Sequence, residues 1–557
     1  MKAMKKILAT VMCLCVLFGC LSMTASGAAA TGSITIKNPD HSEATVAGKT
    51  FNLYKIFNAT TSGSNISYSW YEKDGEIPFY DFFFGPNGYV EANKTNGNVQ
   101  DAVDKVSKID GNLALSQFAE ELHKYIVANN IDTFIDPVVV ADGKSSVTID
   151  SLPYGYYLVY DATDLSGDTA AVRSAVMLTN VSNGAVITLK ANRPQIEKYV
   201  LENDEVTYGK GTSSSIGDTV TFKIMTLAPS HTLYTTYHYS IEDTLPEGLI
   251  LDQDSIKVYK GTTLLSEGSG YDLEVPAASG ASFEIDFTNY MDDFTIGDEL
   301  IVIYDTTATS DIKPQKANQN IATLIYSNDP TNDTSTGSVS DYANVYSYQF
   351  VFTKFASDTN GVLTNVRLSG AEFQLYKIEN GTETLVKFEK VAATNQEGAT
   401  FYKYYVDMNG SVDTLETQNT GDATITLDHL NMGGHLGDVF IFGLSEGKYK
   451  IVETKAPDGY VLPDAPFEIE ITDAIGQLGS VGTLTVTGSH TGSGSIVNMN
   501  GMAESILTVW AEITNKPGSA LPETGGMGTT LFTIFGVVLM AGALAFFTLR
   551  KRNKVVA

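Results

Sequence analysis

The end of the chain can fold in only one way. Residues 525–549 are apolar and carry no charged side chain, and Arg550, Lys551, Arg552 and Lys554 follow them. A helix of this length spans the roughly 30 Å of a bilayer's hydrocarbon core, and a basic tail holds its end on the cytoplasmic side. This segment therefore predicts a single transmembrane anchor, with the rest of the chain folded outside the membrane.

The start of the chain indicates export. Three lysines precede an apolar run over residues 7–21, and the alanines at positions 28–30 supply a small-residue cleavage site. These are the features of a secretory signal peptide. We therefore expect residues 1–30 to be removed and the mature chain to begin at Thr31.

The mature chain is acidic and has no cysteine. All three cysteines, Cys13, Cys15 and Cys20, lie in the expected signal peptide, so no disulfide can form. Cys20 offers an alternative, lipoprotein processing, but a chain anchored at its C-terminus has no need of a second anchor. The formal net charge is −29, and without the seven basic residues of the two ends it is −36. Such a surface argues against nucleic acid as a partner and suits a solvated extracellular rod.

The composition between the two ends is typical of β-sandwiches. Tyr (29) and Phe (26) far outnumber Trp (2), and 49 glycines supply turns. We expect a mainly β chain of three tandem immunoglobulin-like β-sandwich domains over residues 31–190, 195–346 and 348–515. Residues 516–557 then hold a linker and the membrane segment with its basic tail. One amphipathic helix is expected in the first domain, from the helical spacing of Leu115, Phe118, Leu122, Tyr125 and Ile126.

The second and third domains share a pattern of buried polar residues. Each has a lysine early in its first strand, a carboxylate in a middle strand and an asparagine in its last strand. Residues i and i+2 of a strand face the same side, and by this parity each of these residues faces the apolar core. The two trios are Lys198, Asp243 and Asn320, and Lys354, Glu453 and Asn515.

Burial gives such a trio two possible roles. Burial lowers the pKa of an amine and raises that of a carboxylic acid, so both tend to be neutral. A neutral lysine can attack the asparagine carboxamide, release ammonia and leave an isopeptide bond, with the acid polarising the carbonyl. The alternative is a buried ion pair beside an asparagine that hydrogen-bonds the backbone.

The residues before the membrane segment resemble a known processing signal. Leu521, Pro522, Glu523, Thr524 and Gly525 are similar to the sorting signal of Gram-positive surface proteins. The resemblance implies that a sortase cysteine attacks the Thr524 carbonyl and cleaves the bond to Gly525, and that an amine later releases the acyl-enzyme. Pro522 favours the extended backbone that an enzyme groove accepts. The alternative is a plain single-pass anchor.

The trios also lie in segments that resemble Gram-positive pilins. Residues 449–460 are similar to the pilin E-box, which makes Glu453 the catalytic glutamate, and residues 368–376 resemble the second strand of the collagen-adhesin B-type domain. The resemblance implies a bond between Lys354 and Asn515. The second domain is similar to the fimbrial isopeptide domain, with Asp243 as the acid, Lys198 as the amine and Asn320 as the acceptor. Asn318 has the same parity and stays an alternative acceptor, and the first domain has no complete trio.

A lysine at the end of the first domain resembles the amine that resolves the sortase intermediate in pilins. Lys190 follows residues 186–189, just before the Pro194 linker, although Thr188 and Leu189 stand where the family has Tyr-Pro. The resemblance implies that Lys190 links one subunit to the next. The alternative is an ordinary solvated lysine at a strand end.

Together these features predict a secreted, cell-wall-anchored structural protein, the backbone pilin of a sortase-assembled fimbria. The expected partners are a sortase, other pilin subunits, the peptidoglycan cross-bridge and, before sorting, the membrane; no cofactor, metal or nucleic acid is expected. Isopeptide formation would be a single intramolecular turnover. The alternatives are a monomeric wall-anchored adhesin and a minor pilin at the tip or base. A surface hydrolase is disfavoured, because the sequence has no H-E-x-x-H motif and no cysteine remains after the expected signal peptide is removed.

Overall fold

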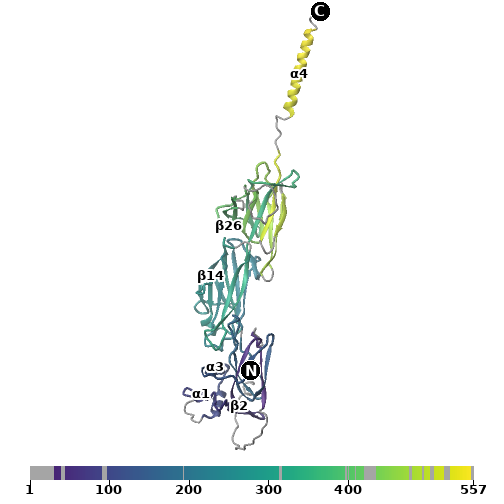
Figure 1. Cartoon of the computed structure of the whole chain (residues 1–557). Helices are drawn as coiled ribbons and strands as arrows, with labels where there is room; N and C mark the ends of the chain where they lie inside the picture. The colour runs from purple at the N-terminus through teal and green to yellow at the C-terminus, as the bar shows by residue number, and fades with distance from the viewer. Residues whose placement is uncertain are drawn as a thin grey trace.

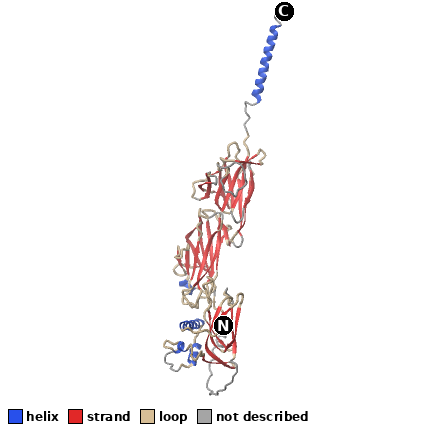
Figure 2. Ribbon diagram, viewed as in Figure 1, coloured by secondary structure: helices blue, strands red, loops and turns tan. Residues whose placement is uncertain are grey.

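The computed structural model has an elongated shape with a long helix at one end (Figure 1). It describes residues 30–38, 44–90, 97–191, 193–312, 316–394, 398, 400–407, 409–419, 435–475, 479–491, 495–501, 507–519 and 527–552. The strands form six sheets, and each sheet takes its strands from one of three segments of the chain. We call these segments the first module (β1 to β8), the second module (β9 to β20) and the third module (β21 to β33). They follow one another along the long axis (Figures 1 and 2).

The first module has two sheets and a cover of helices. One sheet has the order β5-β1-β8, and the other has β3-β2-β6-β7 with β4 beside β2. Phe51 and Leu53 of β2 pack between the two sheets, whereas Tyr54 and Ile56 pack against the helices. The strands are β1 Thr31–Lys37, β2 Thr50–Ser62, β3 Asn65–Trp70, β4 Val138–Val139, β5 Ser146–Pro153, β6 Gly155–Asp161, β7 Met177–Val181 and β8 Gly184–Thr188.

The described residues of this module include three helices where one was expected. The predicted amphipathic helix is α3, Asn112–Ala128, and Phe118, Leu122 and Ile126 are buried as expected. The residue pattern did not predict α1, Tyr80–Phe84, or α2, Val99–Ser107. Both are shorter than the window over which helical periodicity can be recognised, which is why only the longest of the three was predicted.

The second module is a sandwich of two six-stranded sheets, in the orders β10-β9-β12-β18-β14-β15 and β11-β20-β19-β13-β17-β16. Alternate residues of β12 and β18 are buried, as expected for strands with one face on a core. The strands are β9 Ile196–Leu201, β10 Tyr208–Gly209, β11 Gly211–Ser213, β12 Thr219–Leu227, β13 Tyr239–Thr244, β14 Leu249–Lys260, β15 Thr263–Leu264, β16 Asp272–Glu274, β17 Phe283–Asp286, β18 Glu299–Ala308, β19 Asn318–Ser327 and β20 Thr336–Tyr346, with the 3-10 helix η1 at Thr288–Asp293.

The third module is also a two-sheet sandwich. One sheet has the order β25-β26-β28-β21-β33-β32 with β22 beside β21, and the other has β24-β23-β29-β30-β31 with β27 beside β23. The strands are β21 Tyr348–Ser357, β22 Leu363–Arg367, β23 Glu372–Glu379, β24 Thr382–Leu385, β25 Phe388–Thr394, β26 Thr400–Val406, β27 Leu415–Glu416, β28 Asp438–Leu444, β29 Gly447–Lys455, β30 Phe467–Ile475, β31 Val481–Ser489, β32 Ser495–Gly501 and β33 Thr508–Asn515.

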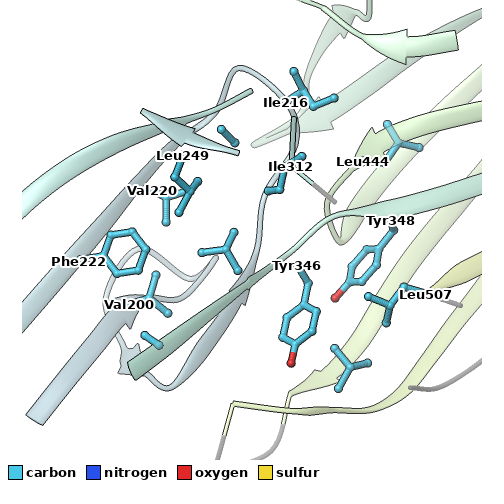
Figure 3. Packing of buried hydrophobic residues seen from close by; sticks show 14 of the residues in the cluster. Val200, Ile216, Val220, Phe222, Leu249, Ile312, Tyr346, Tyr348, Leu444 and Leu507 are labelled. Atoms are coloured by element: carbon cyan, nitrogen blue, oxygen red, sulfur yellow. The ribbon is translucent and has the colours of Figure 1, made fainter. Parts of the chain in front are cut away.

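The second and third modules share one hydrophobic core. Only Ser347 separates β20 from β21, and that residue is fully buried. Tyr346 and Tyr348 lie on its two sides, within a single cluster that continues to Leu444 and Leu507 (Figure 3). Because apolar burial is lost if the modules separate, this junction is stiff.

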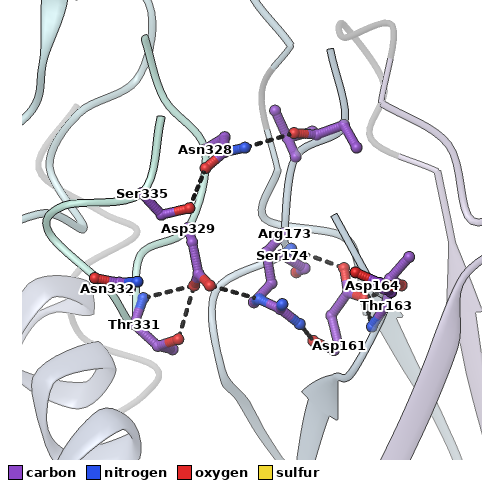
Figure 4. A network of polar contacts seen from close by, with 12 residues as sticks. Asp161, Thr163, Asp164, Arg173, Ser174, Asn328, Asp329, Thr331, Asn332 and Ser335 are labelled. Atoms are coloured by element: carbon purple, nitrogen blue, oxygen red, sulfur yellow. Dashed lines mark hydrogen bonds and ion pairs between the residues drawn. The ribbon is translucent and has the colours of Figure 1, made fainter. Parts of the chain in front are cut away.

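A polar network connects the first and second modules (Figure 4). Arg173 lies between them: its Nε is 2.8 Å from Asp329 Oδ2, and its Nη1 donates to the Asp161 carbonyl. The Arg173 amide donates to the Asn328 carbonyl at 2.7 Å, and Asn328 Nδ2 donates to the Ala171 carbonyl at 3.1 Å. The joint therefore combines these directional polar contacts with apolar contacts of Ala44 and Val172, which lie in the hydrophobic cluster of the second module.

Candidate cross-linking and sorting sites

In the third module the predicted trio meets in the core. Lys354 lies on β21 and Asn515 on β33, which are parallel neighbours in one sheet, and Glu453 reaches them from β29 in the opposite sheet. Lys354 Nζ is 2.9 Å from Glu453 Oε2 and also donates to Asn515 Oδ1. Asn515 Nδ2 donates to Glu453 Oε1 at 2.6 Å. The carboxyl group thus contacts both nitrogen atoms of the other two side chains.

Burial shifts the pKa values of the two titratable groups of this trio in opposite directions. Lys354 and Asn515 are fully buried, and the Glu453 side chain is 1% exposed. Loss of hydration lowers the pKa of Lys354 to about 8, despite the opposing effect of Glu453. The same cause raises the pKa of Glu453. Both groups are shifted toward the neutral forms that amide exchange requires.

In the second module Lys198 contacts Asp243 directly, and Asn320 is linked to Lys198 through a tyrosine hydroxyl. Asp243 on β13 and Asn320 on β19 are on neighbouring strands, and Lys198 on β9 contacts Asp243 from the opposite sheet. All three side chains are fully buried, and Lys198 Nζ donates to Asp243 Oδ2. Burial lowers the pKa of Lys198 and raises that of Asp243.

A tyrosine that sequence analysis missed completes the second-module site. Tyr304 lies on β18, and its hydroxyl oxygen Oη is 2.7 Å from Lys198 Nζ and 2.8 Å from Asn320 Nδ2. Alternation along β18 indicates that Tyr304 faces the core, because Val302 and Thr306 are buried with it. The alternation gives no hint that this hydroxyl lies against the trio, since that depends on the register of the two sheets.

The structure corrects one detail of the predicted pattern. Asn320 is not on the last strand of the second module but on β19, which β20 follows as an antiparallel neighbour. The alternative acceptor Asn318 lies on the same strand, and its Nδ2 donates to the Val345 carbonyl at 3.1 Å and the Lys316 carbonyl at 3.3 Å. Asn320 is the asparagine that shares a partner, Tyr304, with Lys198.

The first module has a buried lysine and acid of its own. Lys49 Nζ lies 2.6 Å from both Asp161 Oδ2 and the Val172 carbonyl. Asp161 is fully buried and also accepts from the Ser174 amide at 2.9 Å. Within the described part of the chain, no asparagine side chain joins this pair, so it is an ion pair at the joint between modules.

Lys190 is exposed just after β8, close to the start of the second module. Its amide donates to Ser174 Oγ at 3.1 Å, and its carbonyl accepts from the Ala175 amide at 3.1 Å. The backbone at Lys190 is therefore held in place while the side chain remains accessible, which is what an attacking amine needs.

The chain leaves the third module along the E-box segment. The Val461 amide donates to the Lys516 carbonyl at 2.9 Å, and the Gly518 amide donates to the Gly459 carbonyl at 2.8 Å. Gly459 adopts φ 85°, a left-handed conformation that favours glycine. These contacts fix the point from which the sorting segment extends.

The sorting residues Leu521, Pro522, Glu523, Thr524 and Gly525 lie outside the described residues, as does the expected signal peptide up to residue 29. Beyond them, α4 covers Met527–Arg552. Within it, Leu531–Lys551 is long and apolar enough to cross a membrane, and it is not covered by the rest of the protein. This helix agrees with the predicted C-terminal membrane segment.

Two family matches cover parts of the chain. Residues 353–478 match the SpaA prealbumin-like fold domain, which includes Lys354 and Glu453. Residues 513–555 match the LPXTG cell wall anchor motif. These matches confirm the predicted resemblance to sortase-assembled Gram-positive pilins and the predicted secreted, wall-anchored location.

Similar proteins are found among both curated sequences and solved structures. The trypsin-resistant surface T6 protein of Streptococcus pyogenes serotype M6 is 25% identical over 418 residues, which are 67% of this chain and 72% of that protein. The T6 backbone pilin structure of the same organism has 17% identity and a TM-score of 0.48, over 88% of this chain and 99% of that one. The major pilin SpaD of Corynebacterium diphtheriae has 18% identity and a TM-score of 0.44, over 88% and 98%.

Proposed function

We propose that this wall-anchored Gram-positive surface protein is the backbone subunit of a fimbria that a sortase polymerises. The observation that carries the proposal is the LPXTG cell wall anchor match at the end of a chain whose third module matches the SpaA domain. An elongated succession of sandwiches suits a shaft subunit (Figure 1). We further propose that the three modules correspond to domains with the bounds 31–190, 195–346 and 348–515, the second and third of which pack against each other.

Polymerisation needs an acyl donor and an amine on every subunit. In this proposal a sortase cysteine attacks the Thr524 carbonyl, the bond to Gly525 breaks, and the Lys190 amine of the next subunit attacks the resulting thioester. The exposed side chain of Lys190 supports its role as the amine. The last subunit is released instead to an amine of the peptidoglycan cross-bridge, and α4 holds the chain in the membrane until that point.

We also propose that Lys198 bonds to Asn320, and Lys354 to Asn515, through isopeptide bonds. The lysine Nζ attacks the asparagine Cγ, the bond from Cγ to Nδ2 breaks, and Nδ2 leaves as ammonia. Asp243 and Glu453 hold the protons and polarise the carbonyl groups. The contacts of the third module support this, because Lys354 touches both Glu453 and Asn515.

The polymerisation proposal is tested by an immunoblot of cell-wall extracts. Deletion of residues 521–524 should stop both polymerisation and wall anchoring. Lys190→Ala should abolish the ladder of polymers while monomers still reach the wall, because cleavage at Thr524 does not require Lys190. Lys144→Ala, which removes another exposed lysine of the first module, is the matched control and should leave the ladder intact.

A ladder that persists in Lys190→Ala would assign polymerisation to another lysine. A parent strain with monomers only would favour the adhesin or minor-pilin alternative.

A further inference from the structure

We infer that Tyr304 is a catalytic residue of isopeptide formation in the second module, where it passes a proton from Lys198 Nζ to the departing Asn320 Nδ2. The inference rests on the proposed isopeptide bonds and adds a fourth residue to one of them. It comes from a difference between the two sites that the sequence trios do not reveal.

The two acids do not have the same reach. In the third module Glu453 contacts both nitrogens, at 2.9 Å from Lys354 Nζ and 2.6 Å from Asn515 Nδ2. In the second module Asp243, one methylene shorter, contacts Lys198 Nζ and is hydrogen-bonded to the Tyr304 hydroxyl. The group next to Asn320 Nδ2 is the hydroxyl of Tyr304, at 2.8 Å. The tyrosine hydroxyl therefore occupies the role that the second carboxylate oxygen has in the third module.

The aromatic rings beside the two lysines show the same difference between the modules. Lys354 Nζ lies over the rings of Phe373 and Phe467, at 5.4 and 5.5 Å from their centres. Lys198 Nζ lies over Phe222 and Tyr304, at 5.1 and 5.2 Å. Each amine thus has two rings beside it, and only in the second module does one of them carry a hydroxyl. Apolar packing alone would be served by phenylalanine.

The hydroxyl oxygen accepts from both nitrogens, so it lies between the atom that must lose a proton and the atom that must gain one, and its own hydrogen has to turn toward Asn320 Nδ2 during the reaction. As Lys198 Nζ bonds to Asn320 Cγ, the attacking amine gives one proton to Tyr304 Oη. The Tyr304 hydroxyl proton passes to Asn320 Nδ2, which leaves as ammonia when its bond to Cγ breaks. The tyrosine ends as it began, and the products are one isopeptide bond and one ammonia.

The remaining polar atoms of the site are consistent with separate roles for Asp243 and Tyr304. Asp243 Oδ1 and Asn320 Oδ1 are buried and have no hydrogen-bond partner among the described residues. An unpaired buried acceptor is costly, and a proton on Asp243 would give that side chain a hydrogen to donate. Asp243 is then the group that polarises the Asn320 carbonyl, and Tyr304 is the group that serves the leaving nitrogen.

The test is the intact mass of the mature chain, residues 31–524, made without a sortase and followed over time after a pulse of synthesis. The parent should fall short of its calculated mass by two ammonias. Tyr304→Phe should lose the ammonia of the third module as rapidly as the parent. It should lose the ammonia of the second module roughly 100-fold more slowly than the parent. Tyr239→Phe is the matched control, because it removes a buried hydroxyl of the same core that bonds to Thr226 and the Leu227 carbonyl.

A rescue separates catalysis from packing. Asp243→Glu combined with Tyr304→Phe gives the second module the longer acid and the phenylalanine of the third, and the second ammonia should again be lost quickly. Protease resistance of the second module shows that each variant is folded. If Tyr304→Phe loses both ammonias at the parent's rate, or if the folded double variant does not regain the fast loss, the assignment is wrong. A parent of full calculated mass would instead overturn the isopeptide proposal itself.

Discussion

At the scale of single residues, burial decides the chemistry of the two lysines. In water an amine with a pKa near 10.4 is almost fully protonated at neutral pH. Burial lowers the pKa of Lys354 to about 8, so a useful fraction becomes a nucleophile. The enclosed acid and asparagine then stand within contact, which removes most of the entropic cost of bringing the groups together.

Each acid should be required for isopeptide formation in its own module only. Glu453→Ala should leave the mature chain short of one ammonia, that of the second module, and Asp243→Ala should leave it short of one, that of the third. Each acid serves its own core, so neither change should affect the other site. Intact mass with peptide mapping measures this, and Glu468→Ala, on an exposed position of β30, is the control. Loss of both ammonias in either variant would show that the acid is dispensable.

The trios themselves could be predicted from parity, because a polar residue that shares a strand face with Ile, Phe and Tyr must enter the core. Lys198, Asp243 and Asn320 are all fully buried. Tyr304 could not be predicted in the same way. An inward-facing tyrosine is common, and its contact with Lys198 depends on where β18 stands relative to β9, with β12 between them.

At the scale of secondary structure elements, α3 lies near the loop after β19 at the joint between the first two modules, since Asp329 and Asp333 of that loop influence Glu120 of α3. Glu120 of α3 has its Oε1 buried without a hydrogen-bond partner in the described part of the molecule. Burial, with a smaller contribution from Asp333 and Asp329, raises the pKa of Glu120 to about 7, and Lys124 opposes this shift. A charge on Glu120 is therefore unfavourable at this joint.

The joint should lose stability as the pH rises. The folded-state pKa of Glu120 lies above its ordinary value, so the unfolded chain releases this proton first and stability falls between about pH 4.5 and pH 7. Glu120→Gln should remove this decline: its thermal unfolding should match the parent at pH 4 and occur at a higher temperature at pH 8. Glu121→Gln, on the exposed neighbour, is the control. If the unfolding temperatures of Glu120→Gln and the parent differ equally at pH 4 and pH 8, the effect does not come from the titration of Glu120.

The elements of the sandwiches were easier to predict than the helices of the first module. Long strands such as β12 and β18 can be recognised from the alternation of apolar and polar residues along them. The short helix α2 does begin at a helix-capping residue, since Asn98 accepts from the Gln100 amide. Nine residues are too few for periodicity to identify such a helix, and the phenylalanines of α1 are equally typical of a strand.

At the scale of the whole molecule, the proposed linkages define how a fibre would carry load. Force would enter a subunit at Lys190 and leave it at Thr524, so the first module would lie beside the load path. The path would cross the second module through the bond from Lys198 to Asn320 and the third through the bond from Lys354 to Asn515. This accounts for a first module in which a buried ion pair, Lys49 with Asp161, suffices.

In the third module the proposed cross-link would connect the first strand directly to the last. Lys354 and Asn515 are 161 positions apart in sequence, yet they lie on neighbouring parallel strands, one at each end of the module. Closing a loop of this length stabilises the folded state by about 5 kcal/mol in the chain-entropy model. More important for a fibre, with this proposed bond in place tension could not draw out the enclosed residues.

Single-molecule stretching should reveal this directly. Because the mature chain has no cysteine, Lys190→Cys and Ala520→Cys supply two unique handles. The parent should show no extension from the third module, whereas Lys354→Ala should release its closed loop and add roughly 500 Å, at about 3.3–3.6 Å per residue. Lys448→Ala, at an exposed position of β29, should behave as the parent, and the second module should stay closed in both variants. A parent that extends by the same length would show that tension is carried by hydrogen-bonded strands and not by a covalent bond.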